Sequence, residues 1–244
     1  MPPKHLQLKT FWSKSTTHEQ QHLSNFTQCK TPLVLTQAMC EEFKLPTLVG
    51  KFDSIEAVYQ AFKYLFLINP PAKAKLEAIL FDFMTTNRNS SGLSAKRGGN
   101  ASTMTKVHKV RLNKSLWTWD VQMKIMRLAV SARAEVDPSY AQSLERARAE
   151  GWIWIHLETK RGKPVTPEWG AHWSVKQNCY IGNNRLGNII AEIASKRHMA
   201  SPSTSASTSA SASASASASA SASASVSASM SASSPAISSL SFPA

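Results

Sequence analysis

The sequence predicts an α+β fold that is predominantly helical and has a few short strands. Apolar residues recur at helical spacing in several long segments, whereas strict alternation of apolar and polar residues is confined to short stretches. Helical and extended segments follow no regular βαβ alternation, and no internal repeat is present. We therefore expect one compact, helix-rich domain.

The first strong helical pattern begins at Asp53 or Ser54, either of which can cap a helix that runs to about Asn69. Its predicted buried face consists of Ile55, Val58, Phe62 and Phe66. Pro70-Pro71 stops this helix, and a proline suits the first turn of the next one. That second helix is expected to bury Leu76, Ile79, Leu80 and Phe83. Residues 85–102 are rich in Asn, Ser and Gly and are expected to form a loop.

Three more helices and a strand are predicted in the second half of the chain, and two weaker strands in the first half. Thr118 can cap a helix whose apolar stripe is Val121, Ile125, Leu128 and Ala132. Asp137-Pro138 predicts the cap and first position of a shorter helix that ends at Gly151. Residues 152–157 alternate as a short strand does, and residues 33–36 and 48–52 are weaker strand candidates. A last helix should start near Asn184 and bury Leu186, Ile189, Ile190 and Ile193.

Composition divides the chain at about residue 200. Residues 201–244 are almost entirely Ser and Ala and contain no charged residue. Such a segment has too little apolar surface to offset the entropy of ordering its backbone, so we expect it to be disordered. Residues 1–200 then form the folded domain. They hold all of the formal charge of +13, which should attract phosphates, nucleotides or nucleic acid.

Several classes of protein are disfavoured by what the sequence lacks. Cys29, Cys40 and Cys179 are too sparse for a disulfide framework or a zinc site. The N-terminus has no apolar signal stretch, and no run approaches the roughly 18 apolar residues of a membrane span. The histidines are scattered singly, which disfavours a zinc or triad hydrolase. We expect an intracellular protein, cytoplasmic or nuclear, without metal, cofactor or membrane contact.

Glu56 is the main candidate for chemistry. It lies three residues after Asp53, so it can close a capping box at the helix start. On a helix, Tyr59, Gln60 and Lys63 would share its face at i+3, i+4 and i+7. A nearby lysine keeps a carboxylate ionised, which is what stabilising a cationic sugar transition state needs. These residues leave both interpretations of Glu56 open.

Three other features are typical of a nucleotide site. Lys96 and Arg97 precede two glycines, although the Walker spacing is absent and a solvated turn is the alternative. Residues 180–187 join a turn to a helix start, where free N–H groups favour an anion, although a plain turn is again possible. Trp117, Trp119 and Trp169 stand beside helix starts or acidic residues, where a ring can line a pocket and stack on a planar base.

Taken in order, six segments of the chain resemble the NADAR (YbiA-like) family. They are Phe11-Trp12, Leu23-Ser-Asn-Phe26, Ser54-Ile-Glu-Ala-Val-Tyr-Gln-Ala-Phe-Lys63, Trp119-Asp120 with Met126, Trp169-Gly170 and Gly182-Asn-Asn-Arg-Leu-Gly187. The resemblance covers about residues 8–197. It implies a compact YbiA-like domain and an N-glycosidase that hydrolyses the bond between a base and a ribose phosphate.

Known members of that family act on intermediates of riboflavin biosynthesis, and others remove ADP-ribose from guanine in nucleic acid. The first activity is the one that we expect, on a small ribosyl phosphate. An ADP-ribose glycohydrolase acting on nucleic acid and an inactive module that binds ADP-ribose or nucleotides are the alternatives. The chain departs from the family pattern at Ala57, where a histidine is usual, and near Gly99, where an arginine is usual.

The resemblance also implies roles for individual residues. Glu56 would be the catalytic carboxylate and Lys63 its paired lysine. The implied substrate-binding residues, together with their neighbours in the same segments, are Asn25, Phe26, Tyr59, Gln60, Lys96, Arg97, Trp119, Asp120, Glu168, Trp169, Gly182, Asn184 and Arg185.

Overall fold

The computed structural model describes residues 7–11, 22–157 and 168–200. The strands are β1 (Gln7–Phe11), β2 (Leu33–Leu35), β3 (Gly50–Phe52), β4 (Trp152–His156), β5 (His172–Ser174) and β6 (Cys179–Ile181). The helices are α2 (Gln37–Glu42), α3 (Ile55–Lys63), α4 (Lys73–Phe81), α5 (Gly92–Gly98), α6 (Ala101–Lys106), α7 (Trp119–Val136), α8 (Pro138–Ala149) and α9 (Arg185–Ala200). The Ser/Ala-rich tail and Trp12 lie outside the described residues.

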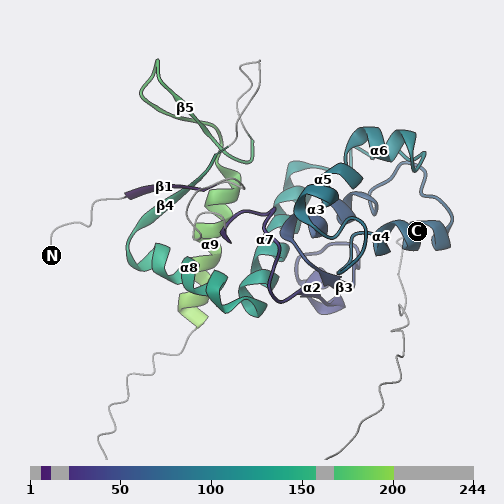
Figure 1. The fold of residues 1–244 in the computed structure, drawn as a ribbon, viewed down its shortest axis with the longest axis horizontal. Helices are drawn as coiled ribbons and strands as arrows, with labels where there is room; N and C mark the ends of the chain where they lie inside the picture. Colours follow the sequence, from purple (N-terminus) through teal and green to yellow (C-terminus); the bar gives the residue numbers. More distant parts are fainter. Residues whose placement is uncertain (1–6, 12–21, 158–167, 201–244) are drawn as a thin grey trace, which may run out of the picture.

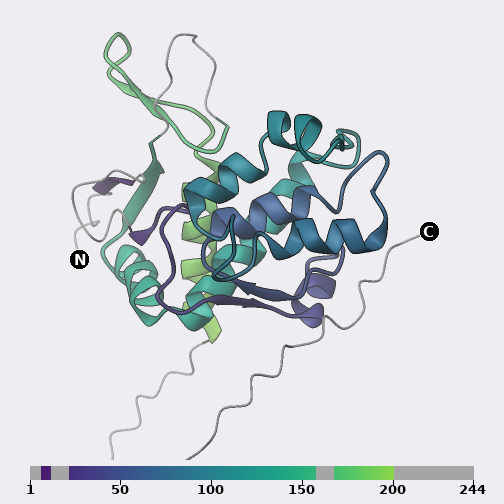
Figure 2. The same cartoon turned by 45° about the vertical axis from the view of Figure 1, so that its right-hand side comes forward.

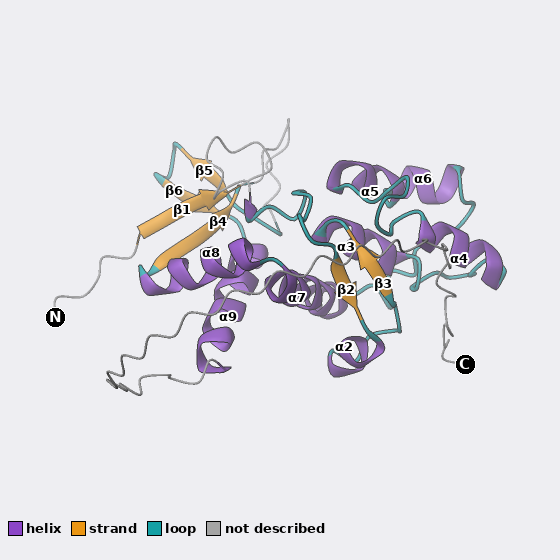
Figure 3. Cartoon of the chain, turned by 60° about the horizontal axis from the view of Figure 1, so that its bottom comes forward, coloured by secondary structure: helices purple, strands orange, loops and turns teal. Residues whose placement is uncertain are grey.

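The described strands pair into three small sheets of two strands each. β1 and β4 run parallel, whereas β2 pairs with β3 and β5 with β6 in antiparallel hairpins. The β5–β6 hairpin projects away from the helices (Figures 1 and 2). Helices make up much more of the described chain than strands do, as Figure 3 shows. This mixed, mainly helical arrangement agrees with the predicted α+β class.

Helix α7 runs through the middle of the described fold. It packs against α3 and β2 on one side and against α8 and α9 on the other (Figure 3). Ile125, Leu128 and Ala132 of its predicted stripe are at most 1% exposed, and Val121 is partly buried. Each fully buried aliphatic side chain of this kind contributes about 1.5–3 kcal/mol relative to exposure. Burial of this stripe therefore joins the two sides of the molecule.

Side-chain caps begin several helices where the sequence predicts them. Ser54, Thr118 and Asp137 each accept a hydrogen bond from the backbone N–H three residues later. Such a cap stabilises a helix by about 0.5–2 kcal/mol. The residues predicted to be buried are buried both in α4 and in α9, although Phe83 lies just beyond the end of α4. No helix in the described ranges is long and apolar enough to cross a membrane.

The predicted end of the first helix is wrong. α3 ends at Lys63 and does not continue to about Asn69. Leu67 instead forms an isolated β-bridge with Leu112, and the N–H of Ile68 donates to a carbonyl of the same distant loop. The backbone therefore leaves the helix because it pairs with residues 111–113.

The prediction of a loop over residues 85–102 is also wrong. This region contains α5 and the start of α6. Ser91 Oγ accepts from Ser94 N at 3.4 Å, and Asn100 Oδ1 accepts from Thr103 N at 2.8 Å. Serine and asparagine favour loops, but the same side chains cap helices. Here they begin two short helices, of which α5 packs against α3.

Candidate active site

Helix α3 carries Glu56 in a buried polar cluster. The residue is 5% exposed, and two amides hold its carboxylate. Asn25 Nδ2 donates to Oε2 at 2.5 Å, and Gln60 Nε2 donates to Oε1 at 2.6 Å. The backbone N–H of Glu56 donates to the Asn25 carbonyl at 3.0 Å. A carboxylate that accepts on both oxygens is fixed in orientation and available for chemistry.

The capping-box interpretation of Glu56 is wrong. Ser54 is the cap, and Asp53 instead accepts a hydrogen bond from Thr86 N at 3.1 Å. A glutamate in a capping box reaches back to the N–H of the cap residue. The carboxylate of Glu56 is turned to the two amides, so its burial does not serve the helix end.

Burial and positive charge act against each other at Glu56. Burial raises the pKa of its carboxyl group above the ordinary value, and the hydrogen bond from Gln60 and the charges of Lys63 and Lys96 partly oppose this. A carboxyl group with a raised pKa titrates nearer to neutral pH, which suits acid–base work.

Lys63 lies one helical turn beyond Gln60 and is partly buried. Burial lowers the pKa of its ammonium group, and the negative charge of Glu56 opposes that shift. Its Nζ donates to the Gly99 carbonyl at 3.3 Å and lies 5.4 Å from the centroid of the Tyr59 ring. Lys63 and Glu56 form no direct ion pair in the described chain, so their charges attract each other at longer range.

Phe26 and Lys96 contact each other, and Lys96 is near enough to Glu56 for its charge to lower the pKa of that carboxyl group. Phe26 follows Asn25 directly, and the Nζ of Lys96 lies 4.9 Å from the centroid of the Phe26 ring. Lys96 is exposed and stands in the last turn of α5. A flexible cation at the edge of a buried carboxylate site can reach an anionic group of a bound molecule.

Aromatic rings form a wall beside this polar cluster. The Tyr59 ring contacts Trp117 and Trp169 edge to face, with 5.5 Å between centroids in each pair. Trp169 makes the same kind of contact with Trp119 at 5.8 Å. Gln122 holds the Tyr59 hydroxyl, which donates to its Oε1 at 2.6 Å. Trp119 is 39% exposed, so the wall is accessible from solvent at that ring.

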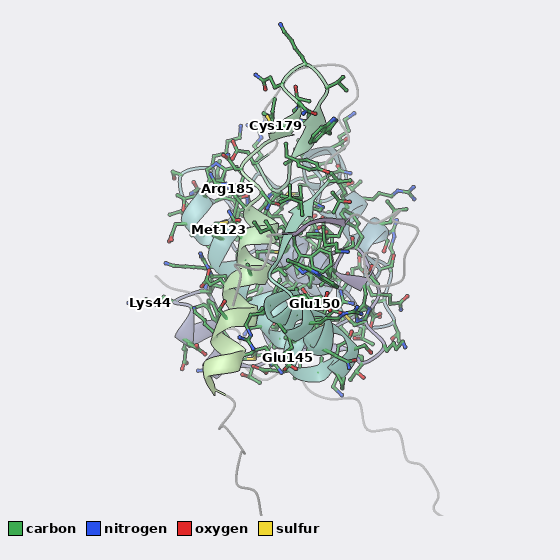
Figure 4. All side chains as sticks on the ribbon, turned by 90° about the vertical axis from the view of Figure 1, so that its left-hand side faces the viewer. Lys44, Met123, Glu145, Glu150, Cys179 and Arg185 are labelled. Atoms are coloured by element: carbon green, nitrogen blue, oxygen red, sulfur yellow. The ribbon has the colours of Figure 1, made fainter. Side chains whose placement is uncertain are left out.

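Glu168 and Arg185 meet at the exposed edge of this wall. Glu168 Oε2 accepts from Arg185 Nε at 3.3 Å and from Asn183 Nδ2 at 2.6 Å. The Arg185 guanidinium lies 4.6 Å from the centroid of the Trp119 ring. In the view of Figure 4, Arg185 lies between Cys179 on the β-hairpin and Met123 on α7. The acidic residue beside Trp169 is therefore part of the assembled site.

Asn184 and Gly182 shape the backbone near the wall. Asn184 Oδ1 accepts from His156 N at 3.0 Å, and its Nδ2 donates to Trp154 O at 2.8 Å. The amide of Asn184 therefore ties the start of α9 to β4. Gly182 has a φ of 145°, and a Cβ there would overlap the backbone of Gly170. Both residues hold the segment that carries Trp169.

Two other predicted substrate-binding residues lie apart from Glu56. Asp120 pairs with Lys124 at 2.8 Å, and its side chain is 69% exposed. Arg97 lines a separate hollow together with Arg88 and His108. The described structure therefore places Asn25 and Gln60 on Glu56 and most of the remaining predicted residues on the aromatic wall and its edge, but Asp120 and Arg97 contribute to neither.

His156 is a site neighbour that the sequence patterns did not single out. Burial lowers the pKa of its imidazole to about 4. A hydrogen bond with the Trp169 backbone opposes this shift, and the positive charge of Lys96 adds to it. Its ring lies 5.2 Å from that of Phe11. His156 lies in the alternating pattern of residues 152–157. That local pattern does not show which residues the pairing of β1 with β4 brings next to it.

The two departures from the family pattern have structural counterparts. Ala57, which follows Glu56 directly, is fully buried. A Cβ at Gly99 would overlap the side chain of Gln60, so any larger residue there requires Gln60 to move. Glycine at this position therefore permits the amide contact to Glu56.

The described fold and site define a mixed α/β protein with a buried carboxylate that two amides hold. Two lysines lie near this carboxylate, and a wall of aromatic rings lies beside it. Among the described residues, no group of three or more His, Cys, Asp or Glu side chains is placed to hold a metal ion. No protein-family model matches the chain, and no curated protein matches it.

Proposed function

We propose that the chain is an N-glycosidase of the NADAR type, with a YbiA-like fold, that hydrolyses the bond between a base and a ribose phosphate. The observation that carries the proposal is the Glu56 carboxylate, which is buried and held by Asn25 and Gln60. The order of the six sequence segments supports the same assignment.

Hydrolysis of a ribosyl C–N bond builds positive charge at the anomeric carbon as the bond breaks. The Glu56 carboxylate stabilises that charge, and the low dielectric of the enclosed site strengthens the attraction. It also serves as the base that orients the attacking water. Water supplies a hydroxyl group to the anomeric carbon and a proton to the departing base. The ammonium group of Lys63 stabilises the negative charge that develops on that base.

The aromatic wall and Lys96 position the rest of the substrate. Trp119 exposes its ring and offers a face for a planar base. Lys96 stands at the edge of the site with a flexible stem and contacts the phosphate.

A panel of N-ribosides tests this function. The panel contains a ribosylaminopyrimidine phosphate of the riboflavin-intermediate type and ADP-ribosylated guanosine, and mass spectrometry identifies the released base. Glu56→Gln should reduce turnover of the cleaved compound by roughly 100-fold or more. Glu145→Gln is the matched control, because Glu145 is exposed on α8 and should leave turnover unchanged. Full activity of Glu56→Gln would contradict the assignment.

A further inference from the structure

The positive charge of the molecule is concentrated in one stretch of the chain. Between Asp82 and Asp120 the sequence contains no acidic residue. It contains seven basic residues, all exposed, which are Arg88, Lys96, Arg97, Lys106, Lys109, Arg111 and Lys114. None of them forms an ion pair with another residue in the described ranges. Unpaired cations gathered in this way create a field that attracts a polyanion.

These cations stand on α5, on α6 and on the loops that flank the two helices, and we call the exposed face of residues 88–114 the basic surface. Helices α5 and α6 lie next to each other beside α3 (Figures 1 and 3). The loop after α6 is held against the end of α3, because Asn113 N donates to Phe66 O at 2.7 Å and Ile68 N donates to Arg111 O at 3.0 Å. Arg111 and Lys114 therefore stand on a fixed backbone, which lowers the entropy lost on binding.

A hollow of about 480 Å³ lies in the basic surface, at the end of α3. Its charged lining comes from Lys63, Arg111 and Lys114. The apolar lining includes Ile68, Met104, Val110 and Leu112. This volume is in the range of pockets that hold small ligands. The hollow therefore combines an apolar floor for a base with cations for phosphate.

Lys63 connects this hollow to the Glu56 site. It lines the hollow, and its pKa responds to the charge of Glu56. Lys63 stands seven positions after Glu56, which is about 10 Å along α3. A second hollow of about 350 Å³ is lined by Arg88, Arg97 and His108, and also by Asp82, the acidic residue that precedes this stretch. The cations thus extend from the edge of the candidate active site across α5 and α6.

We propose that the basic surface binds the phosphodiester backbone of a single nucleic-acid strand, with one unpaired nucleotide in the hollow beside Lys63. Phosphate contacts from exposed Lys and Arg supply most of the affinity in such binding. In a duplex the bases are stacked inside, and placing one in the hollow costs a few kcal/mol of unpairing, so a single strand is favoured. That the strand carries the scissile bond rests on the proposed function, whereas the binding does not.

Fluorescence anisotropy with a labelled strand of about 20 nucleotides tests the surface, with salt varied between about 50 and 200 mM. The double variant Arg111→Gln/Lys114→Gln should weaken binding by about fivefold or more and should reduce the salt slope by roughly 0.7 for each lost phosphate contact. The matched control is Lys44→Gln/Arg148→Gln. It removes the same charge from exposed positions after α2 and on α8, and both of these helices lie away from α5 and α6 (Figure 1).

The outcomes separate the two proposals. Glu56→Gln should bind the strand like the wild type, because it removes the proposed chemistry and leaves the basic surface intact. Strand binding without cleavage of any N-riboside would contradict the glycosidase and support the surface. Equal weakening by the double variant and by its control would overturn the surface, and so would tighter binding of the annealed duplex. Circular dichroism of each variant verifies that the fold is retained.

Discussion

At the scale of single residues, the central feature is a carboxylate held by neutral donors. Glu56 is buried, and the two groups that bond to it are amides from Asn25 and Gln60. Amide donors orient a carboxylate without neutralising it, so its charge stays available to a cationic transition state. The same arrangement has a cost in stability, because burial disfavours the ionised form.

Glu56→Gln is expected to raise the melting temperature at neutral pH. Burial raises the pKa in the folded state above the unfolded value of 4.5, so the folded protein loses stability as pH rises from that value through the folded pKa. The glutamine removes this loss, and Asn25 can turn its free Oδ1 toward the new amide.

Differential scanning fluorimetry of both proteins from about pH 4 to 8 measures this effect. The advantage of the variant should be absent at the acidic end and grow with pH. A variant that melts at or below the wild-type temperature at the alkaline end would show that Glu56 is not destabilising.

Lys96→Gln is expected to move the acidic limb of the pH–rate profile to higher pH. The charge of Lys96 lowers the pKa of Glu56, so its removal lets burial raise that pKa further. Activity requires the ionised carboxylate in the proposed mechanism, and the limb follows its titration. Lys44→Gln, which removes an exposed lysine beside α2, should leave the limb in place. An unchanged limb in Lys96→Gln would show that Lys96 does not act on Glu56.

At the scale of elements, α7 positions the segment that carries Asn25. Arg133 of α7 is fully buried, and its NH1 donates to Ser24 O at 3.2 Å. Its Nε lies 3.4 Å from Asp137 Oδ2, and His22 Nε2 lies 3.3 Å from the same oxygen. This buried cluster ties the residues before Asn25 to the junction of α7 and α8. The orientation of the Glu56 carboxylate, which Asn25 holds, therefore depends in part on α7.

Arg133→Met is expected to destabilise the fold by about 3–5 kcal/mol, because Asp137 would keep a buried charge after losing the guanidinium that pairs with it. Arg127→Met on the same helix is the control. Arg127 pairs with Glu192 at a partly exposed position, and loss of such a pair costs about 1 kcal/mol or less. Urea denaturation of the two variants measures the difference. Similar costs for both would contradict the structural role of the cluster.

At the scale of the whole molecule, the described residues before position 201 already form a continuous buried core. Its described members run from Phe11 to Ala194, and α9 contributes Leu186, Ile189 and Ile190. Residues 201–244 are almost entirely Ser and Ala, so they contain few of the large apolar side chains that fill such a core.

Deletion of residues 201–244 is therefore expected to change the melting temperature by less than about 2 °C. A longer deletion that begins at Arg185 removes α9 and should abolish cooperative unfolding, because α7, α8 and β4 lose their packing partner. Thermal melts followed by circular dichroism compare the two truncated proteins with the full chain. A large loss of stability on removal of the tail alone would show that the tail contributes to the fold.

Local signals explain which elements could be predicted. Ser54, Thr118 and Asp137 stand directly before apolar stripes. Neighbouring residues therefore predict both the cap and the buried face of each helix. α5 and α6 are too short to show a full apolar period, and their polar residues suggested a loop. β1 was missed because its partner β4 lies more than 140 residues away. The β5–β6 hairpin carries no strong alternation and was missed as well.

For this protein, the sequence alone determined the helices with strong periodicity, the division of composition near residue 200 and Glu56 as the leading candidate. It determined these because each depends on neighbouring residues or on the order of motifs. Only the tertiary structure decided that Asn25 holds Glu56 and that Lys63, Arg111 and Lys114 line one hollow. Those contacts join segments far apart in the chain, and a pattern along the chain does not specify which faces meet when it folds.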